Sequence, residues 1–386
     1  MSNEKENTSK ELRFTVLGPS GAGKTSMLAC MYNEFEDLRS GMLVPDPETS
    51  RIMQIAYSKL RNSANSPSPE FETAIEGTED LREYKFGIKG KNETLFIRFY
   101  DFPGGWMEQS SSNYGQILEI AKQSDVILVA VNTPYVMEED GFYAEAGISG
   151  ATIQNIITTS YDGGNKLILL VPIKCEKYTK TVEDTRRMCA RLKEKGIFKR
   201  TVGLMNNPTY SDMTMVILPI HTVGNAEFDK FIKDQNGNIL REVYKKVPGK
   251  RFSPMDTEQP IRFVMSFLLN KIARIKAEEV KQAKASPEPS LGGALGGAAA
   301  GAAIGSFIPF IGTTIGAIVG GMIGAFGGTN NAEALKILQQ KEFLELGDFI
   351  RQGMKLDDPR FEIIGGRDKL EKIPLQELEA LTKSNS

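Results

Sequence analysis

The sequence predicts an α/β fold in which helices flank a mostly parallel β-sheet. Between residues 13 and 270, short apolar runs alternate with polar or helical stretches. Most runs are apolar almost throughout, as expected for strands that are covered on both faces. A glycine-rich segment, residues 18–25, separates the first run from a helical pattern. The expected strands are residues 13–17, 84–88, 95–100, 126–131, 166–172 and 215–219.

A short polar turn, residues 90–93, separates the second expected strand from the third. Connections of this length join antiparallel neighbours. We therefore expect one antiparallel strand, at an edge of the otherwise parallel sheet.

The composition excludes several classes of function. The 386 residues include 47 basic and 49 acidic side chains, a formal net charge of -2, so nucleic acid is not an expected partner. Three cysteines and a single histidine favour neither a disulfide framework nor a zinc site, and they fit a reducing compartment. Residues 1–12 lack the apolar run of a secretory signal, so we expect a cytoplasmic protein.

Changes in composition divide the chain into five parts. The α/β domain is followed by a charged, proline-containing linker, an uncharged apolar segment and a polar tail with amphipathic helices near 332–349 and 375–381. The predicted parts are a polar N-terminal tail (1–12), the α/β domain (13–275), the linker (276–290), the apolar segment (291–328) and the helical tail (329–386).

The glycine-rich segment matches the pattern G-x-x-x-x-G-K-[ST], which binds phosphate when it lies between a strand and a helix. Glycines let the backbone turn tightly, so that successive amides and a helix N-terminus point at the anion. We expect Lys24 to contact the β and γ phosphates and to act in catalysis, and Thr25 to bind Mg²⁺. The alternative is a glycine turn with a solvated lysine. The expected phosphate-side residues are Gly18, Ser20, Gly21, Ala22, Gly23, Lys24, Thr25 and Ser26.

The third expected strand leads into Asp101-Phe102-Pro103-Gly104. At the end of the strand, Asp101 can hold a water of the Mg²⁺ shell. The Gly104 amide can approach a γ phosphate because no Cβ blocks it. The alternative makes Asp101 a turn residue.

The fifth expected strand runs into Ile173-Lys174-Cys175-Glu176, which resembles the Asn-Lys-x-Asp element of GTPases with two substitutions. The Glu176 carboxylate can accept hydrogen bonds from the two donors on the guanine edge, which adenine does not offer in the same arrangement. Ile173 cannot replace the asparagine. The alternative is a surface ion pair between Lys174 and Glu176.

Together, residues 12–275 resemble a Ras-like, translation-factor-type P-loop GTPase. The altered base element together with the later loop Pro219-Ile220-His221-Thr222 is also similar to the double-GTPase group of bacterial conflict systems. The resemblance implies GTP or GDP and Mg²⁺ as ligands, and a regulatory role with a separate effector or activating protein. It places the Mg²⁺-bound threonine that senses the γ phosphate at Thr78, with Thr73 and Thr49 as rivals, and a base-contacting loop at Thr222. His221, next to it, is expected to be an ordinary loop histidine.

Ras-like enzymes commonly carry a glutamine directly after the glycine of the Asp-x-x-Gly element. Here that position is Gly105, followed by Trp106. Glu108 and Gln109 are near enough to substitute, or are simply solvated. We expect slow intrinsic hydrolysis, accelerated by a partner, by self-association or by an arginine supplied in trans. Trp106 either marks an effector contact or is partly buried against its own loop.

Within residues 291–328, glycine recurs at every fourth position on both sides of Pro309. On a helix this spacing makes a stripe along which two helices approach closely in lipid. Each arm would be about 24 to 28 Å long at 1.5 Å per residue, just short of a ~30 Å hydrocarbon core. We expect a glycine-zipper hairpin that inserts into a membrane, with the protein on the cytoplasmic face and homo-oligomers through the stripes. The alternatives are a buried helical pair and a flexible low-complexity segment.

The leading hypothesis is a GTP-binding, slowly hydrolysing switch that is coupled to the membrane hairpin. A second hypothesis is a membrane-permeabilising effector of the defence or toxin type, in which the nucleotide-binding domain keeps the effector inactive until it is triggered. A third is an ATP-dependent enzyme or a non-hydrolysing ATP-binding scaffold.

Overall fold

The structure is a computed structural model. It describes residues 11–37, 43–72, 75, 80–89, 94–107, 110–138, 150–161, 163, 166–194, 196–267, 270 and 352–371. Several predictions fall outside these residues, namely those on the linker 276–290, the apolar segment 291–328 and the helices near 332–349 and 375–381. No helix of the described residues is both long and apolar enough to cross a membrane.

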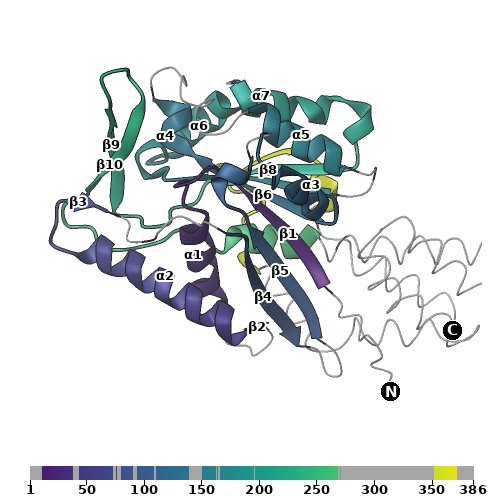
Figure 1. The fold of residues 1–386 in the computed structure, drawn as a ribbon, viewed down its shortest axis with the longest axis horizontal. Coiled ribbons are helices and arrows are strands. Elements are labelled where there is room, and N and C mark those ends of the chain that lie inside the picture. The colour runs from purple at the N-terminus through teal and green to yellow at the C-terminus, as the bar shows by residue number, and fades with distance from the viewer. Residues whose placement is uncertain are drawn as a thin grey trace, which may run out of the picture.

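An eight-stranded sheet forms the centre of the fold, in the order β11-β8-β7-β6-β1-β5-β4-β2 (Figure 1). Five neighbouring strands are parallel, and all six strands expected from the sequence are present. β6 and β7 are buried at every position, which explains their uninterrupted apolar runs. The parallel strands are β1 (Glu11–Leu17), β5 (Thr94–Asp101), β6 (Val126–Asn132), β7 (Lys166–Ile173) and β8 (Met213–Ile217).

The prediction of one antiparallel edge strand is correct for direction but wrong for position. β4 (Arg82–Lys89) runs antiparallel to β5, but it is not the edge. β2 (Leu43–Pro45) pairs antiparallel with β4, and β11 (Glu362–Gly365) pairs antiparallel with β8 at the opposite edge. Strands as short as these leave too few residues for a hydrophobic period to be visible.

Helices cover both faces of the sheet. One apolar cluster joins the sheet to α1, α2 and the helical residues 259–267, and the other joins its opposite face to α3, α5 and α6 (Figure 1). The helices are α1 (Lys24–Asp37), α2 (Pro47–Asn65), α3 (Tyr114–Lys122), α4 (Thr133–Met137), α5 (Gly150–Ser160), α6 (Val182–Glu194) and α7 (Gly196–Gly203).

A second sheet of three antiparallel strands was not expected. Its order is β3-β10-β9, with β3 (Glu70–Phe71), β9 (Ala226–Lys233) and β10 (Ile239–Lys246). The turn between β9 and β10 is closed by Asp234 Oδ1, which accepts from the backbone nitrogens of Asn236 and Asn238 over 2.8 Å each. Gly237 supplies the positive φ of 84°.

Residues 352–371 pack on the α/β domain, whereas their sequence predicted a separate helical tail. β11 extends the main sheet, and Ser266 Oγ donates to the Leu370 carbonyl over 2.9 Å. Asn270 Nδ2 donates to the carbonyls of Lys369 and Glu371 over 3.0 and 2.7 Å. The residues just before position 271 and those just after position 351 therefore contact one another on the same part of the domain.

Candidate functional site

The carboxyl ends of the five parallel strands lie at one edge of the sheet, where α/β proteins place their ligands. The glycine-rich loop leaves the end of β1, Asp101 ends β5, and Lys174 follows β7. A cavity of about 570 Å³ opens at this edge. The cavity is lined by the following predicted residues: Ser20, Gly21, Ala22, Gly23, Lys24, Thr25, Ser26, Gly104, Lys174, Glu176 and Thr222.

The loop at residues 18–25 has the tight backbone that its glycines allow. Gly23 has a φ of 105°, which residues with a Cβ rarely adopt, and α1 begins directly after it at Lys24. The N-terminus of a helix thus faces the cavity, and its amides and partial positive charge favour an anion there.

The Lys24 side chain is buried and folds back over its own loop. Its Nζ donates to the carbonyl of Gly18 over 2.9 Å and to that of Pro19 over 3.2 Å. Burial lowers the pKa of the ammonium group, and the nearby charge of Asp101 acts in the opposite direction. The only hydrogen bonds described for this ammonium are to carbonyl oxygens, so a phosphate oxygen would be a stronger, charged acceptor.

Thr25 and Asp101 meet beside this ammonium. Thr25 Oγ1 donates to Asp101 Oδ2 over 3.1 Å, and both side chains are buried. A hydroxyl and a carboxylate are the kinds of oxygen that Mg²⁺ uses in proteins, so the pair fits that ion. Thr78 and its rival Thr73 lie outside the described residues. Thr49 lies in the first turn of α2, where its backbone nitrogen donates to the side chain of the N-cap residue Asp46 over 3.2 Å. No cluster of three or more His, Cys, Asp or Glu side chains suited to a metal occurs in the described part of the chain.

Gly104 lies directly against the glycine-rich loop. A Cβ added at Gly104 would be 1.9 Å from the Ser20 nitrogen, whereas a Cβ at Gly105 would meet nothing within 4 Å. The same segment also touches the start of the loop, because the Gly18 nitrogen donates to Met107 Sδ over 3.3 Å. Trp106 is partly buried, with its ring centroid 6.3 Å from that of Phe102. Glu108 and Gln109 lie outside the described residues.

Lys174 and Glu176, which follow β7, also line the cavity. Lys174 has a φ of 57°, and its Nζ donates to the Gly21 carbonyl over 2.7 Å. Its ion pair is with Glu242 of β10, not with Glu176 as the alternative interpretation supposed. Glu176 is buried, and its Oε1 accepts from the backbone nitrogens of Val223 and Gly224 over 3.4 and 3.3 Å.

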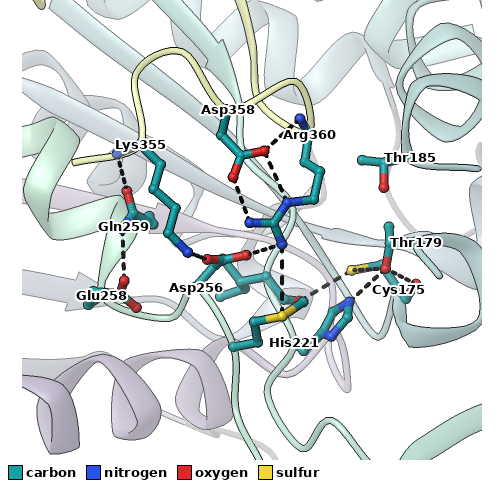
Figure 2. A network of polar contacts seen from close by, with 12 residues as sticks. Cys175, Thr179, Thr185, His221, Asp256, Glu258, Gln259, Lys355, Asp358 and Arg360 are labelled. Atoms are coloured by element: carbon teal, nitrogen blue, oxygen red, sulfur yellow. Dashed lines mark hydrogen bonds and ion pairs between the residues drawn. The ribbon is translucent and has the colours of Figure 1, made fainter. Parts of the chain in front are cut away.

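His221 stabilises the loop that carries Thr222. Its Nε2 lies 2.6 Å from Thr179 Oγ1 (Figure 2). Its backbone nitrogen donates to the Met255 carbonyl, and the Met255 nitrogen donates to the His221 carbonyl. Burial lowers the pKa of His221, while the charges of Glu176 and Asp256 raise it. Burial also raises the pKa of the Cys175 thiol, whose Sγ donates to the Ile220 carbonyl over 3.2 Å. Both side chains therefore serve the loop structure.

Another part of the cavity lining was not predicted from the sequence. It is built largely by the three-stranded sheet, and the hairpin signal was present in the alternating residues 226–233 and in the Asn236-Gly237 turn. The cavity-lining residues that were missed are Leu60, Glu70, Phe71, Glu72, Ile75, Tyr135, Val223, Ala226, Arg241, Glu242, Val243 and Tyr244.

No protein-family model and no curated protein matches the chain. Among solved structures, it is similar to Methanosarcina barkeri Roco2 RocCORdC bound to GDP, with 13% identity and a TM-score of 0.26 over 55% of this chain and 44% of that chain. The signal recognition particle receptor SRb-GTP/SRX complex from Chaetomium thermophilum gives 12% identity and a TM-score of 0.32 over 55% of this chain and 92% of that one. The S. cerevisiae Ski7 GTPase-like domain, bound to GDP and inorganic phosphate, gives 12% identity and a TM-score of 0.33 over 55% of this chain and 43% of that chain. Similarities of this size do not place the chain in a family.

Proposed function

We propose that the chain is a GTP-binding and slowly GTP-hydrolysing switch. The observation that carries the proposal is that Lys24, Thr25, Gly104, Lys174 and Glu176 line one cavity, and that a buried hydrogen bond joins Thr25 to Asp101. Phosphates would lie on the loop amides and the Lys24 ammonium. The base would lie near Glu176 and Thr222.

Hydrolysis would be attack of water on the γ phosphate of GTP, with Lys24 and the loop amides stabilising the charge that develops. A magnesium ion, held through Thr25 and Asp101 and also by Thr78 as the sequence suggests, would neutralise phosphate charge when bound. Gly105 offers no side chain to orient the water. We therefore propose that turnover is slow until an activating protein or a second copy of the chain supplies the missing group.

Calorimetry on the full-length protein tests the nucleotide proposal, with GTP, GDP and ATP titrated in buffer containing Mg²⁺. Lys24→Ala should weaken GTP binding about tenfold or more, because it removes a charged donor to phosphate. The exposed Lys122 at the end of α3 provides the matched control, Lys122→Ala, which should bind normally. Absence of binding heat with every nucleotide would contradict the proposal.

Guanine preference is tested separately by Glu176→Ala, with the exposed Glu183→Ala of α6 as the control. Loss of the carboxylate should reduce the GTP-over-ATP preference about tenfold or more, since a site built to pair with donors discriminates strongly. Equal affinity of the wild type for ATP and GTP would favour the ATP-binding alternative instead.

We further propose that the nucleotide state governs insertion of residues 291–328 into a membrane from its cytoplasmic face. The uncharged glycine-rich sequence supports this, as does the meeting of Asn270 with residues 369–371, because a hairpin must leave and return on one side. Flotation of the full-length protein with phospholipid vesicles, loaded with GTP or GDP, tests it. Release of an entrapped dye would favour the permeabilising effector, and failure to float in both states would contradict insertion.

A further inference from the structure

The carboxylate of Glu242 is a junction at the wall of the cavity. Its Oε2 lies 2.5 Å from Lys174 Nζ and accepts from the Tyr244 hydroxyl, also over 2.5 Å. Its Oε1 accepts from Asn132 Nδ2 over 2.5 Å. The Glu242 side chain is only 12% exposed, so these contacts are made largely out of water and are stronger than those of a surface ion pair.

Through Lys174, this junction reaches the phosphate-binding loop. The same Nζ that pairs with Glu242 donates to the Gly21 carbonyl over 2.7 Å. It also lies 5.5 Å from the centroid of the Tyr244 ring, within the range of a cation–π contact. A chain of polar contacts therefore runs from β10 to Gly21 across the cavity wall.

Other contacts hold the β9–β10 hairpin to the α/β domain, at residues 177–180 and at the end of α2. Lys177 Nζ lies 5.2 Å from the centroid of the Phe228 ring, and Lys180 forms a 2.8 Å ion pair with Glu227 of β9. At the base of the hairpin, Lys246 Nζ donates to the Ser66 carbonyl over 2.8 Å. Of these contacts, the one made by Glu242 is the one that extends to the phosphate-binding loop.

We propose that Glu242 is a positioning residue of the nucleotide site. It holds the Lys174 ammonium on the Gly21 carbonyl, so that β10 forms a fixed wall over the bound nucleotide and slows its release. The inference rests on the proposed function, because it assumes a nucleotide in this cavity. The hairpin formed by β9 and β10 thereby controls nucleotide exchange.

Dissociation of a fluorescent N-methylanthraniloyl-GDP from the full-length protein tests this role. Glu242→Gln keeps the size of the side chain but removes its charge, and should speed dissociation roughly tenfold. Tyr244→Phe removes one hydroxyl and should produce a smaller increase. The control is Glu227→Gln, which breaks the ion pair with Lys180 outside the cavity and should leave the rate unchanged.

A double-mutant cycle separates positioning from general support of the fold. If Glu242 acts through Lys174, then Glu242→Gln should add little once Lys174→Met is present, because the two changes break one chain of contacts. Additive effects, or a wild-type rate for Glu242→Gln, would overturn the inference while leaving nucleotide binding intact. A wild type that binds no nucleotide would overturn the proposed function and this inference together.

Discussion

Thr25 Oγ1 donates to Asp101 Oδ2 over 3.1 Å, so the first turn of α1 is joined to the end of β5 by a buried hydrogen bond. The two residues are far apart in sequence, and each is adjacent to a segment that faces the cavity. The contact brings together the two oxygen groups that fit Mg²⁺.

Asp101→Asn should therefore reduce the Mg²⁺ dependence of GTP binding. The amide nearly preserves the shape of the side chain but removes the charge that supports the ion, and losses of roughly 10- to 100-fold in metal affinity are typical of such changes. Titration of Mg²⁺ at a fixed GTP concentration measures the effect. Ser124→Ala, which removes a different buried hydroxyl contact, to Thr15, serves as the control. An unchanged Mg²⁺ midpoint would remove Asp101 from the metal site.

Gly104→Ala should separate residues 101–107 from the phosphate-binding loop, because the new Cβ would clash with the backbone of Ser20. GTP turnover, measured by phosphate release, should fall roughly tenfold to hundredfold, as expected when a group near the reaction is displaced by about 1 Å. Trp106 is the only tryptophan, so its fluorescence reports the displacement directly. Gly105→Ala has open space around its Cβ and should behave as the wild type. Equal turnover in the two variants would argue against the close approach.

Because of His221, we expect the free energy of unfolding to fall in mild acid. Burial holds its pKa below the unfolded value of about 6.5, so the unfolded chain binds the proton more readily. The contribution of neutral His221 to the free energy of unfolding is complete above about pH 6.5, and it is lost as the pH decreases through the folded-state pKa. His221 is the only histidine, and His221→Asn should flatten the dependence between about pH 5 and 7. The urea midpoints of both proteins across this range measure it, and parallel curves would contradict the assignment.

The central strands and the phosphate-binding loop could be predicted because their signals are local. β6 and β7 are continuous apolar runs, and residues 18–25 carry a complete pattern within one short segment. The cavity wall could not be predicted in the same way. Glu242 is separated by 68 positions from its partner Lys174, and the charged residues of β10 look like an ordinary solvated strand.

The contact of β11 with β8 was missed for a related reason. Its four residues carry little periodic signal, and the long apolar segment before them suggested a separate tail. The roles predicted for the site residues stay predictions, including those of Lys24, Glu176 and Thr222. What the structure adds is that their side chains or backbones line one cavity.

The segment 352–371 is fixed beside the loop that carries His221. Asp256, whose backbone follows the Met255 bridge to His221, is ion-paired with Lys355 and with Arg360, the latter over 2.7 Å (Figure 2). The Asp256 side chain is only 2% exposed. Loss of its charge would leave two cations without this shared partner.

Asp256→Asn should therefore loosen segment 352–371 and lower the free energy of unfolding by about 1 to 3 kcal/mol, the usual cost of leaving buried polar groups poorly paired. Urea unfolding gives the free energy, and limited proteolysis reports release of the segment. Asp357→Asn is the matched control, because that carboxylate is 84% exposed and its ion pair should contribute little. Because Asp256 lies next to the loop beside the proposed base site, the same variant should also weaken nucleotide binding. If segment 352–371 loosened while nucleotide affinity stayed constant, packing of this segment would be energetically independent of nucleotide binding.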